Sequence, residues 1–151
     1  EETVTLMLNM LMGVVDGVHS KAAHKTIGTA VRLRFKYKMK GQIAGKTGTT
    51  QNYSDGWYIG IAPKLVSGVW VGCEDRSVHF RYMSLGQGAN MSLPVWALYM
   101  KKVYDDKSLG YSIEDKFEML PASKLNVEIN CEKYNDQNSN NFDGKPESFD
   151  Q

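Results

Sequence analysis

One short segment of this chain combines residue types suited to holding a peptide-like ligand: Gly45-Lys46-Thr47-Gly48-Thr49-Thr50. Its small side chains would let the backbone lie flat against an extended ligand, as when a peptide adds to the edge of a sheet. A side chain at Gly48 would fill the ligand cleft, and Gly45 would allow close packing of the strand. We therefore predict an edge strand that binds through its backbone and carries one cation, Lys46.

The residues after this segment predict the elements that position it. Gln51–Gly56 is rich in turn formers, and Trp57–Ile61 has the composition of a strand. Pro63-Lys64 predicts a tight reversal before a second strand over Leu65–Gly72. Short connections of this kind predict adjacent antiparallel strands, so the strand that carries Lys46 should pair with the first of these two.

Two helices are predicted to flank this meander. Apolar residues between Leu6 and Val18 recur at helical spacing, and Thr3 is the expected N-cap. Because this helix is apolar almost all round, we expect it to be buried. A second, amphipathic helix should begin with Ser92 as its cap and end near Asp106. The elements together predict an α+β fold, an antiparallel β-sheet meander packed between helices.

Basic and apolar residues alternate strictly from Arg32 to Lys40. Period two predicts a strand whose apolar side chains, among them Leu33 and Phe35, face the body while the cations share the other face. Two interpretations of the cations stay open. They form either a solvated face that discourages edge-to-edge pairing or a cationic strip beside the cleft that meets anionic groups.

Composition excludes several classes of function. With 151 residues and 42% hydrophobic content, the chain can bury one modest core. Its 18 basic and 17 acidic residues argue against general nucleic-acid binding. Cys73 and Cys131 are too few for a disulfide framework, and Cys73 is predicted to be a small buried hydrophobe. His19 and His24 have no acidic or Cys companions, so no metal site is expected.

The Lys46 segment, Asn52-Tyr53-Ser54-Asp55-Gly56-Trp57 and Gly68-Val69-Trp70-Val71-Gly72 together resemble the final third of the transpeptidase domain of class A penicillin-binding proteins. These enzymes cross-link bacterial peptidoglycan. The resemblance runs from about Thr3 to Tyr104. It implies that the fold is the C-terminal part of a serine β-lactamase/transpeptidase-like domain.

The family has two further signature motifs, Ser-x-x-Lys and Ser-x-Asn. No Ser of this chain has a Lys three residues after it. Ser139-Asn140-Asn141 is the one Ser-x-Asn match, but it lies in a polar stretch after Lys-Thr-Gly, whereas the family places it before. We therefore expect a piece of an enzyme whose nucleophile lies elsewhere in a longer parent chain, and we expect this piece alone to be inactive.

The resemblance also implies roles for individual residues. The backbone N–H of Thr49 would donate to the developing oxyanion, together with the N–H of the nucleophilic Ser. Lys46 would organise the Ser-x-Asn hydroxyl and attract the substrate carboxylate, which the hydroxyls of Thr47 and Thr49 would hold. The catalytic residues expected are thus Lys46 and Thr49. The expected substrate-binding set is Lys46, Thr47, Gly48, Thr49 and Thr50.

The implied reaction is attack on a D-alanyl-D-alanine stem peptide, release of D-alanine and acyl transfer to an amine of a neighbouring strand. Expected partners are peptidoglycan stem peptides, β-lactam antibiotics and the rest of the parent chain, with no metal, organic cofactor or nucleic acid. The chain starts Glu1-Glu2 with no visible signal peptide, and Val4–Val18 is short of the ~20 apolar residues a bilayer span needs. A membrane anchor is therefore expected upstream in the parent. The location expected is the cell envelope, on the periplasmic side of the inner membrane.

Three segments are expected. Residues 1–110 would be the C-terminal portion of the penicillin-binding transpeptidase domain, and residues 111–131 a short packed extension. Residues 132–151 are rich in Asn, Asp, Gln and Ser, which predicts a disordered polar tail.

Other functions stay open at this point. Gly41 to Thr47 nearly spells a phosphate-binding loop, but it has three residues between its glycines where the Walker pattern needs four. A non-catalytic wall-binding or interaction module is compatible with the missing nucleophile. A serine β-lactamase shares the Lys-Thr-Gly strand. A Ser-x-x-Lys upstream in the parent gene would favour the enzyme over the module.

Overall fold

The computed structural model describes residues 1–20 and 25–129. The chain divides into two compact units, one of Met7–Glu118 and one of Glu1–Leu6 with Met119–Gln151. His24, Cys131 and the predicted polar tail of residues 132–151 lie outside the described residues.

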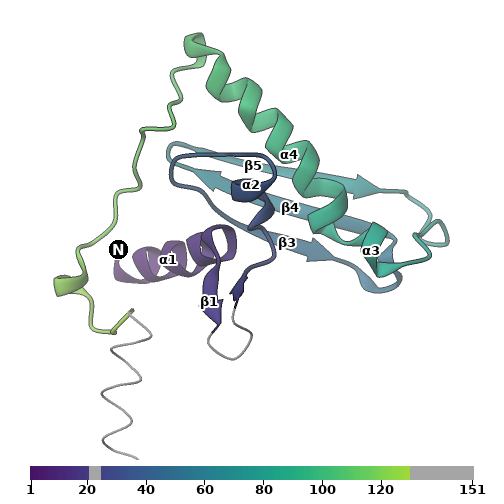
Figure 1. The fold of residues 1–151 in the computed structure, drawn as a ribbon, viewed down its shortest axis with the longest axis horizontal. Coiled ribbons are helices and arrows are strands. Elements are labelled where there is room, and N and C mark those ends of the chain that lie inside the picture. Colours follow the sequence, from purple (N-terminus) through teal and green to yellow (C-terminus); the bar gives the residue numbers. More distant parts are fainter. Residues whose placement is uncertain (21–24, 130–151) are drawn as a thin grey trace, which may run out of the picture. The chain divides into compact units, whose positions relative to one another are not determined.

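The larger unit is built on a three-stranded antiparallel sheet in the order β3-β4-β5 (Figure 1). The strands are β3 (Ala44–Thr49), β4 (Asp55–Ala62) and β5 (Leu65–Gly72). The turn η1 (Gln51–Tyr53) joins the first two. The predicted meander and the α+β fold class are therefore confirmed.

Helix α4 (Gly88–Asp105) covers one face of this sheet. Trp96 of the helix is fully buried and packs edge-to-face on Tyr58 of β4, with ring centroids 5.1 Å apart. A Cβ at Gly60 would lie 2.2 Å from the Trp96 ring, so only glycine fits there. The core also contains the buried side chains of Val15, Leu33, Ile43, Leu93 and Met100.

The start of α4 differs from the prediction. The helix begins at Gly88, and Ser92, predicted as its cap, lies buried inside it, where its hydroxyl donates to the carbonyl of Gly56. The glycine is required because a Cβ at Gly88 would lie 2.3 Å from the carbonyl oxygen of Gly48. The helix therefore starts directly over the strand that carries Lys46.

Helix α1 spans Glu2–Asp16 and so contains most of the predicted apolar run. The prediction that Thr3 caps it is wrong, because the helix begins at Glu2 and Thr3 lies inside it. The expectation that it is buried on all sides is wrong for the described residues. Val15 is buried, but Met7 and Met10 are more than half exposed. The strands β1 (Val18–Ser20) and β2 (Lys25–Ile27) form a short antiparallel pair after it.

The strand predicted from Arg32 to Lys40 does not form. Residues Arg32–Phe35 instead make a single helical turn, α2, and the chain then loops back, with the N–H of Met39 donating to the carbonyl of Leu33 at 2.9 Å. Both Leu33 and Met39 are buried, whereas Phe35 is 60% exposed. Burying the two ends of the apolar series in one core requires a tight loop, and that requirement outweighs the local alternation.

Short elements complete the chain: α3 (Met83–Gly86), η2 (Lys107–Leu109) and, in the smaller unit, η3 (Ala122–Lys124). Within the smaller unit, the N–H of Leu120 donates to the Thr5 hydroxyl at 3.0 Å. Cys73 is exposed, so the prediction that it is buried is wrong; it follows the last residue of β5 and enters a loop. Among the described helices, none is both long enough and apolar enough to span a membrane.

Candidate functional site

Strand β3 has an open edge. It pairs with β4 on one side, and no described strand pairs with its other side. The N–H of Thr50 donates to the carbonyl of Asp55, across to β4, at 3.2 Å. Because successive N–H groups of an extended strand point in opposite directions, the N–H of Thr49 points to the open edge. This is the edge that backbone recognition of an extended ligand needs.

The side chains of β3 divide between the two faces of the sheet. Gly45, Thr47 and Thr49 share the face covered by α4, whereas Lys46 and Gly48 lie on the opposite face, beside Ile59 and Trp57 of β4. A Cβ at Gly45 would lie 2.3 Å from the hydroxyl of Tyr58, so close packing requires this glycine, as predicted.

Gly48 is less crowded. A Cβ there would meet only the Trp57 Cβ within 4 Å, at 3.3 Å. The space next to Gly48 is thus open on the Lys46 face, in the arrangement that a strand facing a cleft requires.

A cavity of about 360 Å³ lies against the other face of β3. Thr47 and Thr49 line it, together with three polar residues from other elements: Thr29, Arg32 and Gln87. Its remaining lining residues are Gly28, Val31, Phe35 and Ala89. The cavity therefore brings three hydroxyls, one amide and one guanidinium together.

Hydrogen bonds orient the threonine hydroxyls that line this cavity. Thr47 donates to Thr29 at 3.1 Å. Thr49 accepts from the backbone N–H of Gly88 at 3.0 Å, which leaves its own O–H hydrogen available to a ligand.

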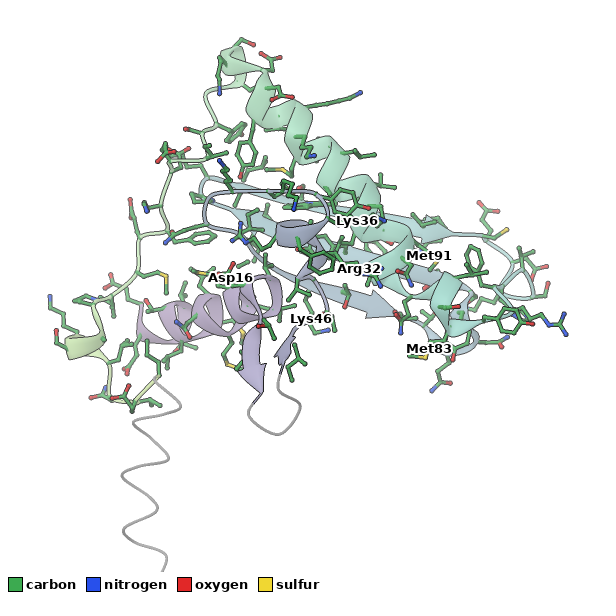
Figure 2. The ribbon with its side chains drawn as sticks, viewed as in Figure 1. Asp16, Arg32, Lys36, Lys46, Met83 and Met91 are labelled. Atoms are coloured by element: carbon green, nitrogen blue, oxygen red, sulfur yellow. The ribbon has the colours of Figure 1, made fainter. Side chains whose placement is uncertain are left out.

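Lys46 does not line this cavity. It is exposed on the opposite face, and its Nζ donates to the carbonyl of Thr47 at 2.8 Å (Figure 2). The side chain of the lysine and those of the two threonines of Lys-Thr-Gly-Thr thus lie on opposite faces of β3. A ligand that uses both must cross the open edge of β3.

Thr50, predicted to bind substrate, closes the turn between β3 and β4. Its hydroxyl donates to the carbonyl of Asp55 at 3.1 Å and accepts from the Asp55 N–H at the same distance. It also lies 3.1 Å from the hydroxyl of Ser54. Thr50 does not line the cavity, and these bonds give its side chain a structural task.

The sequence pattern did not single out Thr29 or Gln87, and it misplaced Arg32 on a strand. Gln87 lies between two glycines, and neither it nor Thr29 belongs to a motif. Tyr58 lies beneath β3, and burial raises the pKa of its hydroxyl, which keeps the phenol neutral.

The phosphate-loop alternative fails on geometry. Such a loop joins a strand to a helix, with its lysine at the start of the helix. Here Gly45, Lys46 and Thr47 lie within β3 and lead into a turn and another strand. Among the described residues, no three His, Cys, Asp or Glu side chains gather in a possible metal site.

Comparison with known proteins gives one consistent result, although no protein-family model matches this chain. Penicillin-binding protein 1A of Aquifex aeolicus is 42% identical over 88 residues, covering 58% of this chain and 11% of the relative. Penicillin-binding protein 1A of Haemophilus influenzae is 37% identical over 81 residues, covering 53% and 9%. The chain thus spans about a tenth of the length of these curated relatives.

The fold agrees with the sequence. A 2.6 Å crystal structure of penicillin-binding protein 1A from Haemophilus influenzae matches with a TM-score of 0.62 and 29% identity, over 80% of this chain and 16% of that one. The match covers more of the chain than the two sequence alignments do. Sequence and fold therefore confirm the resemblance seen around Lys-Thr-Gly: this chain corresponds to part of a class A penicillin-binding protein.

Proposed function

We propose that this chain supplies the Lys-Thr-Gly strand of a serine-type D,D-transpeptidase that cross-links peptidoglycan stem peptides. The observation that carries the proposal is the open edge of β3, with the Thr49 N–H directed to it and the Thr47 and Thr49 hydroxyls lining a cavity beside it. The nucleophile comes from elsewhere in the parent chain.

In this reaction the serine oxygen attacks the carbonyl of the penultimate D-alanine of the donor peptide. The Thr49 N–H and the serine N–H stabilise the oxyanion, the C–N bond breaks, and D-alanine leaves with a proton on its nitrogen. An amine of a neighbouring strand then displaces the serine from the acyl-enzyme. A β-lactam acylates the same serine because its ring amide takes the place of the scissile peptide bond.

Lys46 has a separate task on the other face of β3. Its exposed ammonium, hydrogen-bonded only to the Thr47 carbonyl among the described groups, is available to a hydroxyl brought by another part of the parent. We assign to it the ordering of the Ser-x-Asn hydroxyl. Such residues act as a unit, so the loss of one of them removes most of the rate.

We further infer that the rest of the parent chain covers the face of the sheet that carries Lys46. Trp57 and Trp70 are paired across β4 and β5 on that face and remain 46% and 43% exposed. The run Trp57–Ile61 is apolar on both faces, a pattern typical of strands covered on both sides. The curated relatives have about nine-tenths of their length outside the matched region, which is ample to provide the cover.

We propose that the parent lies in the cell envelope, with this part on the periplasmic side of the inner membrane. Peptidoglycan stem peptides lie on that side, which is where the proposed reaction needs them.

Labelled penicillin tests the proposal. The complete parent protein should form a covalent adduct that survives a denaturing gel, and this chain alone should not, because no Ser-x-x-Lys is present. A labelled band from this chain alone would contradict the assignment of the nucleophile to the parent. An unlabelled, folded parent would favour the non-catalytic module.

Lys46→Ala in the complete protein should slow acylation by roughly a hundredfold or more while the thermal unfolding midpoint stays unchanged, because the side chain is exposed. Thr50→Val is the control variant. Thr50 lies four residues after Lys46, in the turn between β3 and β4. The substitution should lower stability through the lost turn bonds and leave the acylation rate of the folded protein nearly intact. Unchanged acylation in the Lys46 variant would remove Lys46 from the mechanism.

A further inference from the structure

The cations of the Arg32–Lys40 segment do not share one face, because the segment folds into α2 and a loop. Arg34 forms an ion pair with Asp16, with Nη2 2.7 Å from the carboxylate oxygen. Lys38 and Lys40, by contrast, come to the last turns of α4, where they line a pocket of about 170 Å³. The proposed reaction gives these two lysines no role.

A third lysine, Lys101 of α4, lines the same pocket. All three lysines are exposed, and none of them forms an ion pair with a described Asp or Glu. One carboxylate, that of Asp105, also lines the pocket, and the C-terminal end of α4 adds about half a negative charge. Three positive charges therefore outweigh the negative charge around the pocket. Its uncharged lining residues are Met39, Tyr104 and Ile113.

The backbone holds Lys38 in a conformation that lysine rarely adopts. Its φ is 56°, in the left-handed region that favours glycine. Residues strained in this way gather at functional sites. The next residue fixes the turn, because Met39 is buried, its N–H donates to the carbonyl of Leu33, and its carbonyl accepts from Nη1 of Arg34 at 3.0 Å. The loop thus brings Lys38 and Lys40 to α4 by anchoring the residue between them.

Three ammonium groups around one pocket suit a phosphate group. Lysine is a common phosphate ligand, because its ammonium is a compact charge with three rotatable donors. A phosphate group presents three acceptor oxygens, so each lysine can reach a different one. A carboxylate presents only two. The pocket has room for the group, since roughly 10–15 Å³ is enough for one water.

We propose that Lys38, Lys40 and Lys101 form a binding site for a phosphate group. This lysine pocket shares no lining residue with the cavity beside β3. Its ligand is a phosphate ester, supplied either by a soluble phosphorylated molecule or by a lipid headgroup. The site would hold the protein to a phosphorylated component and take no part in acyl transfer, so it does not depend on the proposed function.

Isothermal titration of the complete protein with inorganic phosphate, at low ionic strength, tests the site. The variants are Lys38→Gln, Lys40→Gln, Lys101→Gln and the triple substitution. Lys102→Gln is the matched control, because it removes the same charge from the next residue of α4, lies outside the pocket and makes no described ion pair. The thermal unfolding midpoint of each variant, measured without phosphate, shows that the fold is retained.

Each single substitution in the lysine pocket should weaken phosphate binding roughly three- to fivefold, the size expected for one exposed charge pair. The triple variant should lose about thirtyfold or more. Lys102→Gln should change the affinity by less than about twofold. Acetate, with one charge and two oxygens, should bind the unsubstituted protein more weakly than phosphate does.

Vesicles distinguish the two sources of the phosphate group. Co-sedimentation compares vesicles of phosphatidylglycerol with vesicles of phosphatidylcholine, which carry no net charge. A preference for phosphatidylglycerol that the triple variant loses and Lys102→Gln keeps would support the site and assign its ligand to a lipid headgroup. Equal binding to both kinds of vesicle, with phosphate still bound at the lysine pocket, would support a soluble phosphorylated ligand.

Three results would overturn the proposal. Equal weakening by Lys102→Gln and by the substitutions in the lysine pocket would show a diffuse effect of charge. The absence of saturable phosphate binding by the unsubstituted protein would remove the site altogether. Acetate binding as tight as that of phosphate would overturn the assignment to a phosphate group.

Discussion

The two faces of the β3–β4–β5 sheet are built from alternate residues of the same strands but have very different surroundings. On one face, Tyr58 is fully buried under Trp96 of α4. On the other, Trp57, Ile59 and Trp70 are 46%, 39% and 43% exposed. Tryptophan thus occupies both faces, but it is fully buried only on the first, as Trp96. The first face stabilises this chain, and we propose that the second is covered by the rest of the parent.

The same division runs through the functional strand. Thr47 and Thr49 belong to the covered face, where the start of α4 and the loop before α2 complete a cavity around them. Lys46 belongs to the uncovered face. Among the described residues its Nζ has one hydrogen bond, which it donates to the carbonyl of Thr47. This chain therefore forms the cavity around the two threonines, and we propose that another segment of the parent completes the site on the Lys46 face.

The largest difference in stability between the two faces should come from substituting one tryptophan on each face. Trp96→Ala should lower the free energy of unfolding by about 3–5 kcal/mol, because it leaves a large cavity in the core. Trp70→Ala should cost about 1 kcal/mol or less, because its side chain is already half exposed. Urea unfolding of both variants measures the difference. Equal losses would show that the two faces contribute alike.

The same contrast between the two faces can be tested by adding a single methyl group at one glycine on each face. Gly60→Ala should destabilise by about 3 kcal/mol, since its Cβ would lie 2.2 Å from the Trp96 ring, which is fully buried and cannot move aside. Gly68→Ala on the uncovered face should change stability by less than about 0.5 kcal/mol, because the one close contact of its Cβ would be Cδ1 at the end of the partly exposed Ile59 side chain. Thermal unfolding of the pair checks this. A tolerated Gly60→Ala would mean that α4 does not press on the sheet there.

The smallest effect is expected at Tyr58, whose buried hydroxyl has no hydrogen-bond partner. Tyr58→Phe should stabilise the chain by about 1 kcal/mol at pH 7, because a desolvated polar group is removed. Burial raises the pKa of the Tyr58 hydroxyl, so the unfolded chain ionises first, near pH 10. The contribution of Tyr58 to stability should therefore be constant below that pH and fall above it.

The phenylalanine variant should lose the part of this alkaline dependence that Tyr58 contributes. Urea unfolding at pH 7 and at about pH 10.5 compares the two proteins. An unchanged alkaline slope, or a loss of stability at neutral pH, would show that the hydroxyl is solvated or bonded after all.

Local sequence was sufficient to predict the elements for which composition, periodicity and turn residues indicate the same structure. The turn formers at Gln51–Gly56 and Pro63-Lys64 bound two apolar runs, and these are the limits of β4 and β5 to within two residues. Helical periodicity likewise placed α1 and most of α4. The glycines of the Lys46 strand indicated close packing, and Gly45 against the Tyr58 hydroxyl shows the cause.

Local sequence was insufficient wherever distant residues compete for the same core. The alternation from Arg32 to Lys40 has a strand's period, but burial of both Leu33 and Met39 bends it into α2 and a loop. The prediction that Ser92 caps α4 was wrong, because its hydroxyl donates a hydrogen bond to the carbonyl of Gly56. Cys73 directly follows β5 at the start of a loop, and it is exposed.

The sequence by itself determined the strand that presents Lys46, Thr47 and Thr49, since spacing and small side chains are local properties. Only the tertiary structure decided which side of that strand each residue serves and which companions it has there. Thr29 and Arg32 reach the cavity because the chain folds back over 15 or more residues to β3. No periodicity encodes such a contact, because it depends on how the loop before α2 and the start of α4 close around the strand.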